Sequence, residues 1–329
     1  MQTDATALPG KPGPRERRTS RVLVTGASGY LGSNIVGALL ADSGVGEVVA
    51  GVRDAKAGEA LLTTLGGPER LTLRRGLLPD DPWSLDGIDA LVHVAGVRPG
   101  IGVDDTRILL VNQEGTRRLL ERVPGSGVAR VVYVSALSVY GWERPPPWRE
   151  TMAPRPQTAY GISKWVGEFL CRGLSENVGV AVLRLARVYG LGVGHRLAWT
   201  RMPHRFALLA ARGETIPIFG TGEQRLDLVH VEDVAEAVRR AAVGPGASRR
   251  SVLNVGGGQP VATRRLAELC VAAAGQLGLS APAVTSVPQG GETGPDFGLD
   301  IGRARRILGW EPQRELADGL RELVAAAGK

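Results

Sequence analysis

A glycine-rich turn close to the start of the chain limits its fold more than any other feature. Residues 25–32 read Thr-Gly-Ala-Ser-Gly-Tyr-Leu-Gly, after the apolar run 22–24 and before the helical pattern of residues 34–40. Glycine is needed where backbone approaches a phosphate closely or adopts a positive φ. A strand, such a turn and a helix place backbone N–H groups at a helix N-terminus, where a pyrophosphate binds. We therefore predict a dinucleotide site at Gly26, Ser28, Gly29, Tyr30, Leu31 and Gly32.

Such turns also serve ordinary helix–strand packing, so a second pattern is needed. It lies much further along the chain, where Tyr160 and Lys164 stand in the segment Tyr-Gly-Ile-Ser-Lys. Residues four apart share one helix face, so the ammonium can favour the ionised phenol. The alternative is an ordinary helical pair. A phosphate-binding turn and an activated phenol on one chain indicate a nicotinamide-dependent oxidoreductase.

Apolar runs alternate with helical patterns through the first half of the chain. Buried parallel strands are continuous apolar runs, and crossover helices separate them. The predicted strands are residues 22–25, 48–52, 71–74, 90–95, 131–135 and 180–185, and the helices are centred near Ile35, Leu61, Leu109 and Val166. This alternation predicts an α/β protein with a doubly wound parallel sheet, a Rossmann fold.

Composition excludes several other classes of protein. No apolar stretch approaches the roughly 18 residues of a membrane span. Residues 1–20 are rich in Pro, Gly and Arg and lack an apolar segment, so we expect a disordered tail and not a secretory signal. Cys171 and Cys270 lie in helical patterns and are expected to be buried thiols, with no disulfide and no metal site. A cytoplasmic enzyme fits these features.

The formal charge of +7 raises the question of nucleic acid. Residues 1–21 hold five basic and two acidic residues, so this terminal segment supplies about +3 of that charge. No nucleic-acid motif or interleaving of aromatic and basic residues follows. We therefore expect a small-molecule substrate, with some arginines reserved for an anionic ligand, and neither a nucleic acid nor a membrane as partner.

Further motifs extend the two patterns across almost the whole chain. Together they resemble the extended short-chain dehydrogenases/reductases of the NAD(P)-dependent epimerase/dehydratase group, from about residue 21 to about residue 323. The motifs are Leu-Val-His-Val-Ala-Gly at 91–96, Val-Asn-Gln-Glu-Gly-Thr at 111–116, Ser-Val-Tyr-Gly at 138–141, Ser-Lys-Trp-Val-Gly-Glu at 163–168, Leu-Arg at 183–184, Val-Tyr-Gly at 188–190, Asp-Leu-Val-His-Val-Glu-Asp-Val at 227–234, Leu-Asn-Val-Gly at 253–256 and Leu-Gly-Trp-Glu-Pro at 308–312.

The resemblance implies how the second half is organised. The dinucleotide-binding domain would span residues 21–189, with returning segments near 228–256, and a smaller interleaved C-terminal substrate lobe would comprise residues 190–227 and 257–329. In this half we expect a helix over residues 206–212, a pair of strands at 216–219 and 227–229, and a core strand at 252–255. Residues 261–327 would supply helices and a Pro-rich loop.

The resemblance also extends the list of cofactor contacts. Beside Tyr160 and Lys164 it implies Leu77, Leu78, Ala95, Gly96, Val97, Asn112, Ser135 and Ala186. The residue that ends the second strand selects the cofactor, because an acidic residue there binds the free ribose 2′-hydroxyl of NAD. Val52 holds this position, and the planar guanidinium of Arg53 suits a 2′-phosphate. We predict NADP(H), with NAD(H) as second choice if Arg53 is solvated and Asp54 binds the ribose.

One catalytic side chain of the resembling enzymes is missing. Their Ser or Thr, four residues before the Tyr of the first Val-Tyr-Gly, corresponds to Ala136. Losing such a donor costs roughly 2.7–4 kcal/mol. Ser138 or a substrate hydroxyl replaces it, or catalysis is slow or lost. Ser135 is a poorer replacement, because strand alternation points it to the opposite side.

The same segment and the arginines suggest the reaction and the substrate. Sugar 4,6-dehydratases of this group carry an Asp-Glu pair where this chain has Leu137 and Ser138, so dehydration is not expected. Arg187 replaces a family Asn, and Arg225 lies two residues before Asp227. These arginines either bind a diphosphate or form salt bridges within the lobe. The predicted substrate contacts are Arg98, Ser138, Arg187, His195 and Arg225.

These features predict an NADPH-dependent ketoreductase acting on an activated deoxysugar, such as a nucleotide 4-keto-6-deoxyhexose, or on a related natural-product ketone. The catalytic residues would be Tyr160, Lys164 and Ser138. One alternative is a nucleotide-sugar 4-epimerase, and another is a catalytically impaired NAD(P)-binding regulatory protein. The resemblance also implies a homodimer through helices at 105–122 and 160–174, with Ile108, Leu109, Phe169 and Leu170 at the interface.

Overall fold

The computed structural model describes residues 20–100, 102–193, 202–245, 250–280, 282–288 and 294–328. The predicted tail lies outside these ranges except for Ser20, which is the first residue of strand β1. The predicted substrate residue His195 also lies outside the described residues. Within those ranges, no helix combines the length and the apolar content needed to cross a bilayer.

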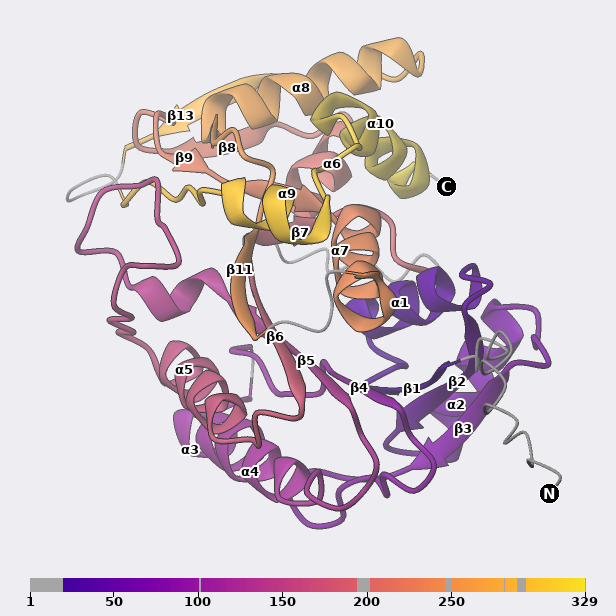
Figure 1. Cartoon of the computed structure of the whole chain (residues 1–329). Coiled ribbons are helices and arrows are strands. Elements are labelled where there is room, and N and C mark those ends of the chain that lie inside the picture. Colours follow the sequence, from indigo (N-terminus) through magenta and orange to yellow (C-terminus); the bar gives the residue numbers. More distant parts are fainter. Residues whose placement is uncertain are drawn as a thin grey trace, which may run out of the picture.

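A seven-stranded parallel sheet forms the centre of the molecule (Figure 1). Its strand order, β11-β6-β5-β4-β1-β2-β3, confirms the doubly wound fold and places the reversal of strand order between β1 and β4. Crevices at such a reversal, beyond the carboxyl ends of the strands, bind ligands. The strands are β1 (Ser20–Thr25), β2 (Val45–Val52), β3 (Leu71–Arg75), β4 (Ala90–His93), β5 (Arg130–Ala136), β6 (Gly179–Leu185) and β11 (Ser251–Val255).

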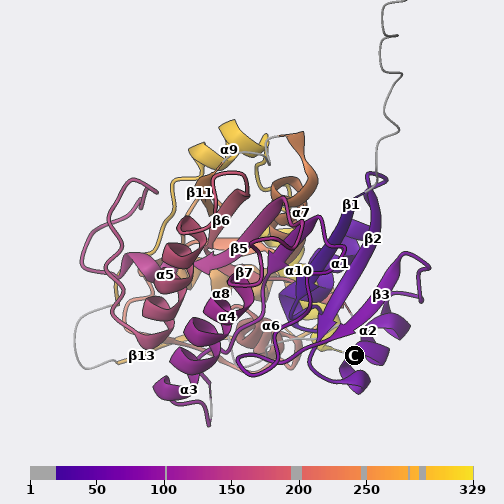
Figure 2. The same ribbon diagram turned by 60° about the horizontal axis from the view of Figure 1, so that its bottom comes forward.

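Helices cover both faces of the sheet because successive residues of each buried strand point to opposite sides. Val22 and Val24 pack in one apolar cluster and Leu23 in the other. One face carries α1 (Tyr30–Leu40), α2 (Ala55–Thr64) and α7 (Val231–Val243); the other carries α3 (Asp105–Leu109), α4 (Gly115–Leu120) and α5 (Ala159–Arg172). Figure 2 shows α3, α4 and α5 grouped away from α1 and α2.

The helix predicted over residues 105–122 is interrupted by a π-helical turn at Leu110–Glu114, between α3 and α4. The predicted interface residue Ile108 is 1% exposed, so it belongs to the core of the subunit and not to its surface. Leu170 likewise packs against a core cluster. The large exposed apolar side chains of these helices are instead Leu110, Ile162, Trp165 and Phe169.

A second group of elements forms the C-terminal lobe, drawn at the top of Figure 1. It has its own apolar cluster, to which Phe206, Leu266 and Leu323 contribute. Its elements are α6 (His204–Ala211), α8 (Thr263–Gln276), α10 (Leu316–Ala327), β8 (Ile216–Phe219), β9 (Arg225–Leu226), β12 (Val261–Ala262) and β13 (Val284–Val287). The strands β7 (Arg187–Tyr189) and β10 (Leu228–His230) form a parallel pair between the sheet and the lobe.

The predicted pairing of residues 216–219 with 227–229 is wrong. Strand β8 pairs with β13, Ile216 opposite Val284, and β10 pairs with β7. The strand β13 lies in the stretch that was expected to supply only helices and a loop. Strands of two to four residues have too little periodicity to reveal their partners, which tertiary contacts select.

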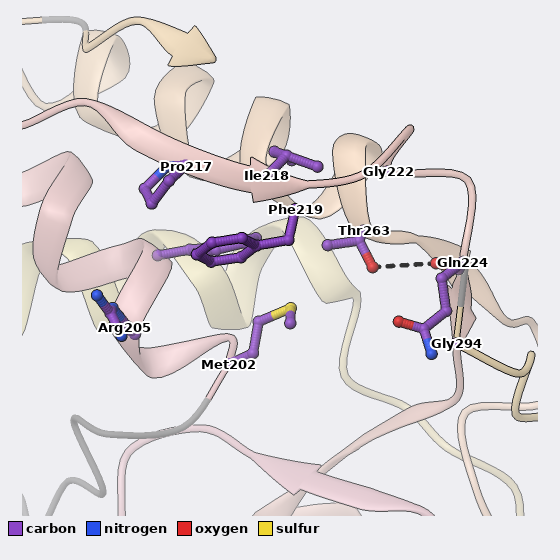
Figure 3. A pocket seen from close by; sticks show the side chains of 10 residues that line it. Met202, Arg205, Pro217, Ile218, Phe219, Gly222, Gln224, Thr263 and Gly294 are labelled. Carbon is purple, nitrogen blue, oxygen red and sulfur yellow. Dashed lines mark hydrogen bonds between the residues drawn. The ribbon is translucent and has the colours of Figure 1, made fainter. Parts of the chain in front are cut away.

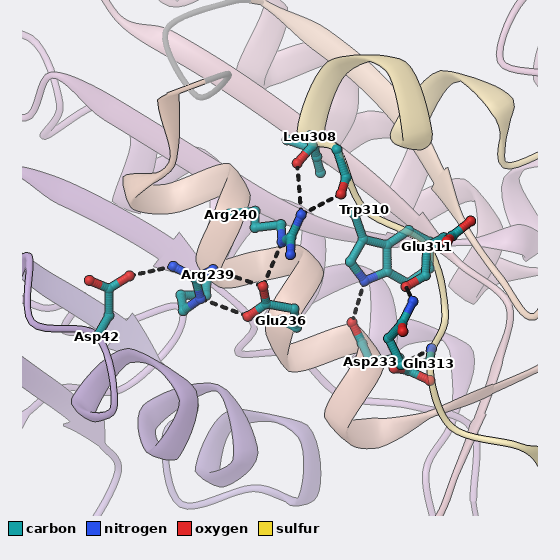
Figure 4. A network of polar contacts seen from close by, with 10 residues as sticks. Asp42, Asp233, Glu236, Arg239, Arg240, Leu308, Trp310, Glu311 and Gln313 are labelled. Carbon is teal, nitrogen blue, oxygen red and sulfur yellow. Dashed lines mark hydrogen bonds and ion pairs between the residues drawn. The ribbon is translucent and has the colours of Figure 1, made fainter.

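Helix α7 connects the sheet side of the molecule to the last part of the chain (Figure 4). Arg239 pairs with both Asp42, just after α1, and Glu236. On the other side of α7, the indole nitrogen of Trp310 donates a 2.9 Å hydrogen bond to the carbonyl oxygen of Asp233. Trp310 therefore packs with the main-sheet cluster, as does Ala304 of α9 (Gly302–Leu308), and this piece of the C-terminal segment lies against the sheet domain.

Candidate active site

The glycine turn forms a cradle between β1 and α1. Gly26 has φ +68°, and a Cβ on it would lie 2.9 Å from the Cα of Ala95. A Cβ on Gly32 would collide with the Gly26 carbonyl oxygen. Gly29 is the N-cap of α1, and the first turn of this helix holds no acidic side chain. A helix start without an acid beside it suits an anion, so the turn fits the pyrophosphate of a dinucleotide.

The end of β2 presents an exposed cation next to a carboxylate that caps a helix. Val52 is 3% exposed and packs into the core. Asp54 is the N-cap of α2, and its side chain accepts a 2.8 Å hydrogen bond from the Ala57 N–H. The Arg53 side chain is 72% exposed, with its Nε 3.6 Å from the Asp54 carboxylate. Asp54 thus already has a structural task, while Arg53 is accessible to a phosphate.

Asn112, in the π-helical turn, holds the loop that follows β4. Its Oδ1 accepts a 2.6 Å hydrogen bond from the Val97 N–H, and its Nδ2 donates to the Val97 carbonyl oxygen at 2.8 Å. A Cβ on Gly96 would lie 3.0 Å from Asn112 Oδ1 and 3.8 Å from Lys164 Nζ. The structure therefore brings Gly26, Gly96, Asn112 and Lys164 to the carboxyl edge of the sheet, where a cofactor would lie.

Helix α5 carries the predicted acid–base pair. Thr158 is its N-cap and accepts a 3.1 Å hydrogen bond from the Gly161 N–H. Lys164 is 5% exposed, and its Nζ donates a 2.9 Å hydrogen bond to the Val134 carbonyl oxygen and lies 5.9 Å from the centre of the Tyr160 ring. Burial, together with the nearby Arg98 cation, lowers the pKa of Lys164 to about 8. An ammonium that is still charged near neutral pH favours an ionised phenol beside it.

The missing hydroxyl at the end of β5 has a neighbour that could replace it. Ala136 is the last residue of β5, and the 3₁₀ helix Leu137–Tyr140 follows directly. The Ser138 Oγ is buried without a hydrogen-bond partner among the described residues. Buried hydroxyls are normally paired, so an unpaired one at such a site is ready for a ligand. A Cβ on Gly161 would lie 2.6 Å from the Ser138 carbonyl oxygen, so Ser138 is packed against the first turn of α5.

Two buried polar groups close to the site were missed by the sequence reasoning. His93 is 1% exposed; its Nδ1 lies 2.8 Å from Thr25 Oγ1, and its Nε2 lies 3.0 Å from Thr116 Oγ1. Burial lowers the pKa of His93 to about 3, so the ring is neutral. The second group is the buried pair of Glu168 and Arg184. A polar residue inside a continuous apolar strand was the available signal for both His93 and Arg184.

The C-terminal lobe contains a pocket of about 250 Å³ that the sequence reasoning also missed (Figure 3). Figure 3 shows the side chains of Met202, Pro217 and Phe219 turned toward one another in this pocket. Phe219 is 62% exposed, although it is a large apolar side chain. The lining also includes Arg205 and Gln224. An accessible ring with a cation and an amide beside it can hold a planar polar group.

The predicted arginines Arg187 and Arg225 both contact Phe297. The Arg187 guanidinium stacks 4.9 Å from the centre of the Phe297 ring, and the Phe297 N–H donates a 2.9 Å hydrogen bond to the Arg225 carbonyl oxygen. Surrounding protein lowers the pKa of Arg187 by desolvation, although its side chain remains accessible. Neither arginine pairs with a carboxylate in the part of the chain that the structure describes, which weighs against a salt-bridge role. Arg225 directly follows Gln224 of the pocket.

Other predicted site residues take varied positions. Burial raises the pKa of Tyr30 and lowers that of Lys164, and the Arg98 charge acts on both groups, which places Arg98 beside the cradle and the catalytic helix. The Ser135 hydroxyl is directed into the protein, where it donates to Glu168 at 2.6 Å. Ala186 follows β6, and its N–H donates to the Val255 carbonyl oxygen; Leu77 is 43% exposed, and Leu78 is buried.

Comparison with known proteins shows to which family the chain is related. The model of the NAD dependent epimerase/dehydratase family matches residues 22–256. The chain is 34% identical to UDP-glucose 4-epimerase of Mycolicibacterium smegmatis over 318 residues, which cover 92% of this chain and 97% of that protein. It is 32% identical to dTDP-6-deoxy-L-talose 4-dehydrogenase (NAD(P)(+)) of Kitasatospora kifunensis over 323 residues, covering 93% and 95% of the two chains.

A solved structure shares the fold over almost its whole length. This is dTDP-glucose 4,6-dehydratase of Streptomyces venezuelae, determined with NAD bound, with a TM-score of 0.77 and 28% identity. The match covers 93% of this chain and 96% of that one. Similar proteins therefore catalyse epimerisation, dehydrogenation and dehydration of nucleotide sugars, and the choice among these reactions depends on the residues of this site.

Proposed function

The chain belongs to the NAD-dependent epimerase/dehydratase family, whose members are NAD(P)-dependent enzymes. From this premise we propose that it is an NADPH-dependent ketoreductase acting on a nucleotide 4-keto-6-deoxyhexose. One observation carries the proposal. The end of β5 and the 3₁₀ helix after it present Ala136, Leu137 and Ser138, and residues 136–140 contain no carboxylate. A phenol, an ammonium and a hydroxyl can protonate a carbonyl oxygen, but they lack the paired acids that eliminate water.

The proposed roles follow from position and chemistry. NADPH, when bound, supplies a hydride. As the carbonyl carbon gains it, Tyr160 would give its phenolic proton to the oxygen, and Lys164 would stabilise the resulting phenolate. Ser138 would hydrogen-bond the same oxygen in place of the hydroxyl absent at Ala136. Asn112 would keep the loop at Val97 in place beside these groups.

The preference for NADPH rests on the end of β2. Val52 offers no acceptor for a ribose hydroxyl, and Asp54 is engaged as the N-cap of α2. Arg53 is exposed and can form charge-assisted hydrogen bonds with a 2′-phosphate. A relative that uses NAD(P)(+) according to its name supports a fold that accepts the phosphorylated cofactor.

The nucleotide part of the substrate is supported by the C-terminal lobe. The pocket at Phe219 has the exposed ring and the polar lining that a nucleobase needs. Next to that pocket, Arg225 and Arg187 both contact Phe297. Their guanidinium groups would bind a diphosphate. This arrangement would leave the sugar at the carboxyl edge of the sheet, where Tyr160 lies.

A second candidate, a nucleotide-sugar 4-epimerase, is favoured by the 34% identity to a UDP-glucose 4-epimerase. An epimerase oxidises and re-reduces the same carbon with a retained cofactor. It gains nothing from Arg53 and an exchangeable NADPH. The two candidates therefore differ in whether the cofactor is consumed.

We also propose a homodimer in the cytoplasm. Leu110, Ile162, Trp165 and Phe169 are exposed on the π-helical turn and α5, on one side of the molecule. An exposed apolar group of this kind is typical of an interface. Cys171 and Cys270 are buried and free, which fits a reducing compartment.

The decisive experiment measures NADPH oxidation by absorbance with a nucleotide 4-keto-6-deoxyhexose as substrate. We expect turnover with NADPH, slower turnover with NADH, and a loss of at least about 10²-fold in Tyr160→Phe with NADPH binding retained. Interconversion of UDP-glucose and UDP-galactose without net cofactor consumption would support the epimerase instead. Tight cofactor binding without turnover on a broad carbonyl panel would support the impaired regulatory protein.

A further inference from the structure

Glu168 and Arg184 form an ion pair inside the protein, between α5 and β6. Their side chains are 0% and 1% exposed. Arg184 Nε donates to Glu168 Oε1 at 2.9 Å, and Arg184 Nη2 donates to Oε2 at 2.7 Å. Burying two charges is costly even when they are paired, and apolar residues of similar volume often stabilise a protein as well or better. Stability alone is thus a weak reason for this pair, and its surroundings suggest another.

On one side the pair holds the catalytic helix against β5. The Ser135 hydroxyl donates a 2.6 Å hydrogen bond to Glu168 Oε1, and the preceding carbonyl, that of Val134, accepts from Lys164 Nζ at 2.9 Å. Lys164 and Glu168 are four residues apart on one face of α5, and Tyr160 lies one further turn toward the helix start. Two consecutive residues of β5 therefore hold two consecutive turns of α5, which sets the height of Tyr160 above the strand end.

On the other side the pair reaches the segment that carries Ser138. The Arg184 guanidinium lies 4.7 Å from the centre of the Tyr140 ring. The Tyr140 hydroxyl in turn donates a 2.7 Å hydrogen bond to Asn254 of β11. Tyr140 closes the 3₁₀ helix that begins just after Ala136. The pair thus contacts both segments that carry the proposed catalytic side chains.

The same carboxylate also acts on the charge of Lys164. Burial and Arg98 disfavour the ammonium, whereas Cys171 and Glu168 favour it. His93 is neutral because burial holds its pKa near 3, so it adds no charge. The groups facing the ammonium are Arg98 after β4, His93 of β4, Tyr133 of β5, and Tyr160, Glu168 and Cys171 of α5.

We propose that Glu168 is a positioning residue of the active site, fixing Tyr160 and Lys164 over the end of β5 through Ser135 and serving as the counter-charge of Lys164, while Arg184 holds its carboxylate in place. The positioning role rests on the proposed function, because it is tested through kcat. The counter-charge role is tested through the ionisation of Lys164, which needs no substrate.

The first test follows the ionisation of Lys164 in the cofactor-free protein. The chain has only four lysines, so an NMR titration with ¹³C-labelled lysine gives few signals, and Lys164→Met identifies the one that matters. Replacing Glu168 alone would strand a buried arginine, so the variant is the double change Glu168→Met with Arg184→Met. We expect the Lys164 midpoint, near pH 8, to fall by about one pH unit. An unchanged midpoint in this folded variant overturns the counter-charge role.

The second test separates position from charge. Ser135→Ala removes the hydrogen bond to Glu168 and leaves every charge in place. We expect kcat of the proposed reduction to fall about tenfold with KM and the Lys164 midpoint nearly unchanged, because only alignment is lost. An unaltered kcat overturns the positioning role.

Trp310→Phe provides the matched control, since it removes a buried hydrogen bond to the Asp233 carbonyl far along the chain. It should lower thermal stability without moving kcat or the Lys164 midpoint. If the control reproduces the kinetic loss of Ser135→Ala, that loss reflects general destabilisation and the positioning role is overturned. If no variant and no wild-type protein turns over substrate, the proposed function fails, while the lysine titration still decides the counter-charge role.

Discussion

The phenol of Tyr30 donates a 2.9 Å hydrogen bond to the carbonyl oxygen of Gly190, 160 residues further along the chain. Tyr30 is the first residue of α1, in the cofactor cradle, and Gly190 follows β7 where the chain enters the C-terminal lobe. His204, at the start of α6, places its Nε2 3.2 Å from the same oxygen. One carbonyl thus joins the cradle to the lobe that carries the proposed nucleotide pocket.

Tyr30→Phe tests this connection by removing only the hydroxyl. We expect a loss of about 1 kcal/mol in the free energy of unfolding, as for one hydrogen bond. Substrate KM should rise severalfold, because the lobe is less firmly placed, while the Kd of NADPH changes less than about twofold. Calorimetric titration of the cofactor and steady-state kinetics provide the two numbers. An equal loss in cofactor affinity would show that the hydroxyl serves the cradle alone.

Arg53→Ala tests the choice of cofactor. Removing a charged hydrogen-bond donor should weaken NADPH binding by about 1.5–3 kcal/mol and leave NADH binding almost unchanged. Lys56→Ala is the matched control, because it removes another exposed cation from the start of α2. Fluorescence titration of both cofactors against the three proteins gives the comparison. Equal affinity of the wild-type protein for NADH and NADPH contradicts the assignment.

The sheet could be predicted from sequence because its inner strands, such as β4, β5 and β6, are buried on both faces. The run Val22-Leu23-Val24 has no exposed side, and all three side chains are 0% exposed. The strand pairing of the C-terminal lobe could not be predicted, because its strands are short and their partners are distant in the sequence. Val284 pairs with Ile216, and no local sequence pattern predicts this pairing. Long apolar runs carry their own signal, and short pairings depend on the assembled fold.

The candidate site was predictable where a motif combines spacing with chemistry. Tyr160 and Lys164 follow the helical spacing, and the structure places the Lys164 ammonium beside Gly96 and 5.9 Å from the centre of the Tyr160 ring. Glu168 continues that spacing by one more turn, yet its role appears only when Ser135 and Arg184 are brought to it. The role of Phe219 could not be predicted for a different reason. The residue type does not identify a pocket, whereas the exposure of its ring in the folded protein does.

Phe169→Glu tests the proposed dimer. The ring is 68% exposed on α5, so the substitution should leave the folded subunit intact and place a charge in the interface. By light scattering at micromolar concentration we expect the wild-type protein at twice the chain mass of 34.7 kDa and the variant at that mass. Circular dichroism checks that the variant is folded. A wild-type mass of one chain contradicts the dimer.

Asp227→Asn tests how a buried carboxylate links stability to pH. Burial raises the pKa of Asp227 from 3.8 to about 6, against backbone hydrogen bonds from Leu299 and Gly257 that lower it. Because the folded pKa exceeds the unfolded one, this group stabilises the protein most below pH 4, and that contribution is lost as pH rises through 6. The loss amounts to roughly 3 kcal/mol. Urea unfolding at several pH values should therefore show the wild-type advantage over Asp227→Asn shrinking between pH 4 and 7; a constant difference contradicts it.

The last prediction concerns the hydroxyl that the family motif has lost at Ala136. If Ser138 replaces it, Ser138→Ala should lower kcat by about 10²–10³-fold with little change in KM, as for one donor to a developing oxyanion. Ser126→Ala is the control, because it removes a hydroxyl that bonds the Val123 carbonyl, in the turn before β5 begins. It should leave kcat unchanged.

Adding Ala136→Ser to the Ser138→Ala variant then asks whether the two positions are equivalent. The end of β5 lies directly before the 3₁₀ helix, so a hydroxyl at residue 136 approaches the same edge of the sheet from the strand and not from the helix. We expect kcat of this double variant to recover part of the loss.

In the wild-type background, Ala136→Ser separates two kinds of site. A gain in kcat indicates a site that was weakened by the alanine, and a loss indicates a site reshaped around its methyl group. Full activity in Ser138→Ala contradicts the assignment and leaves a hydroxyl of the substrate as the donor.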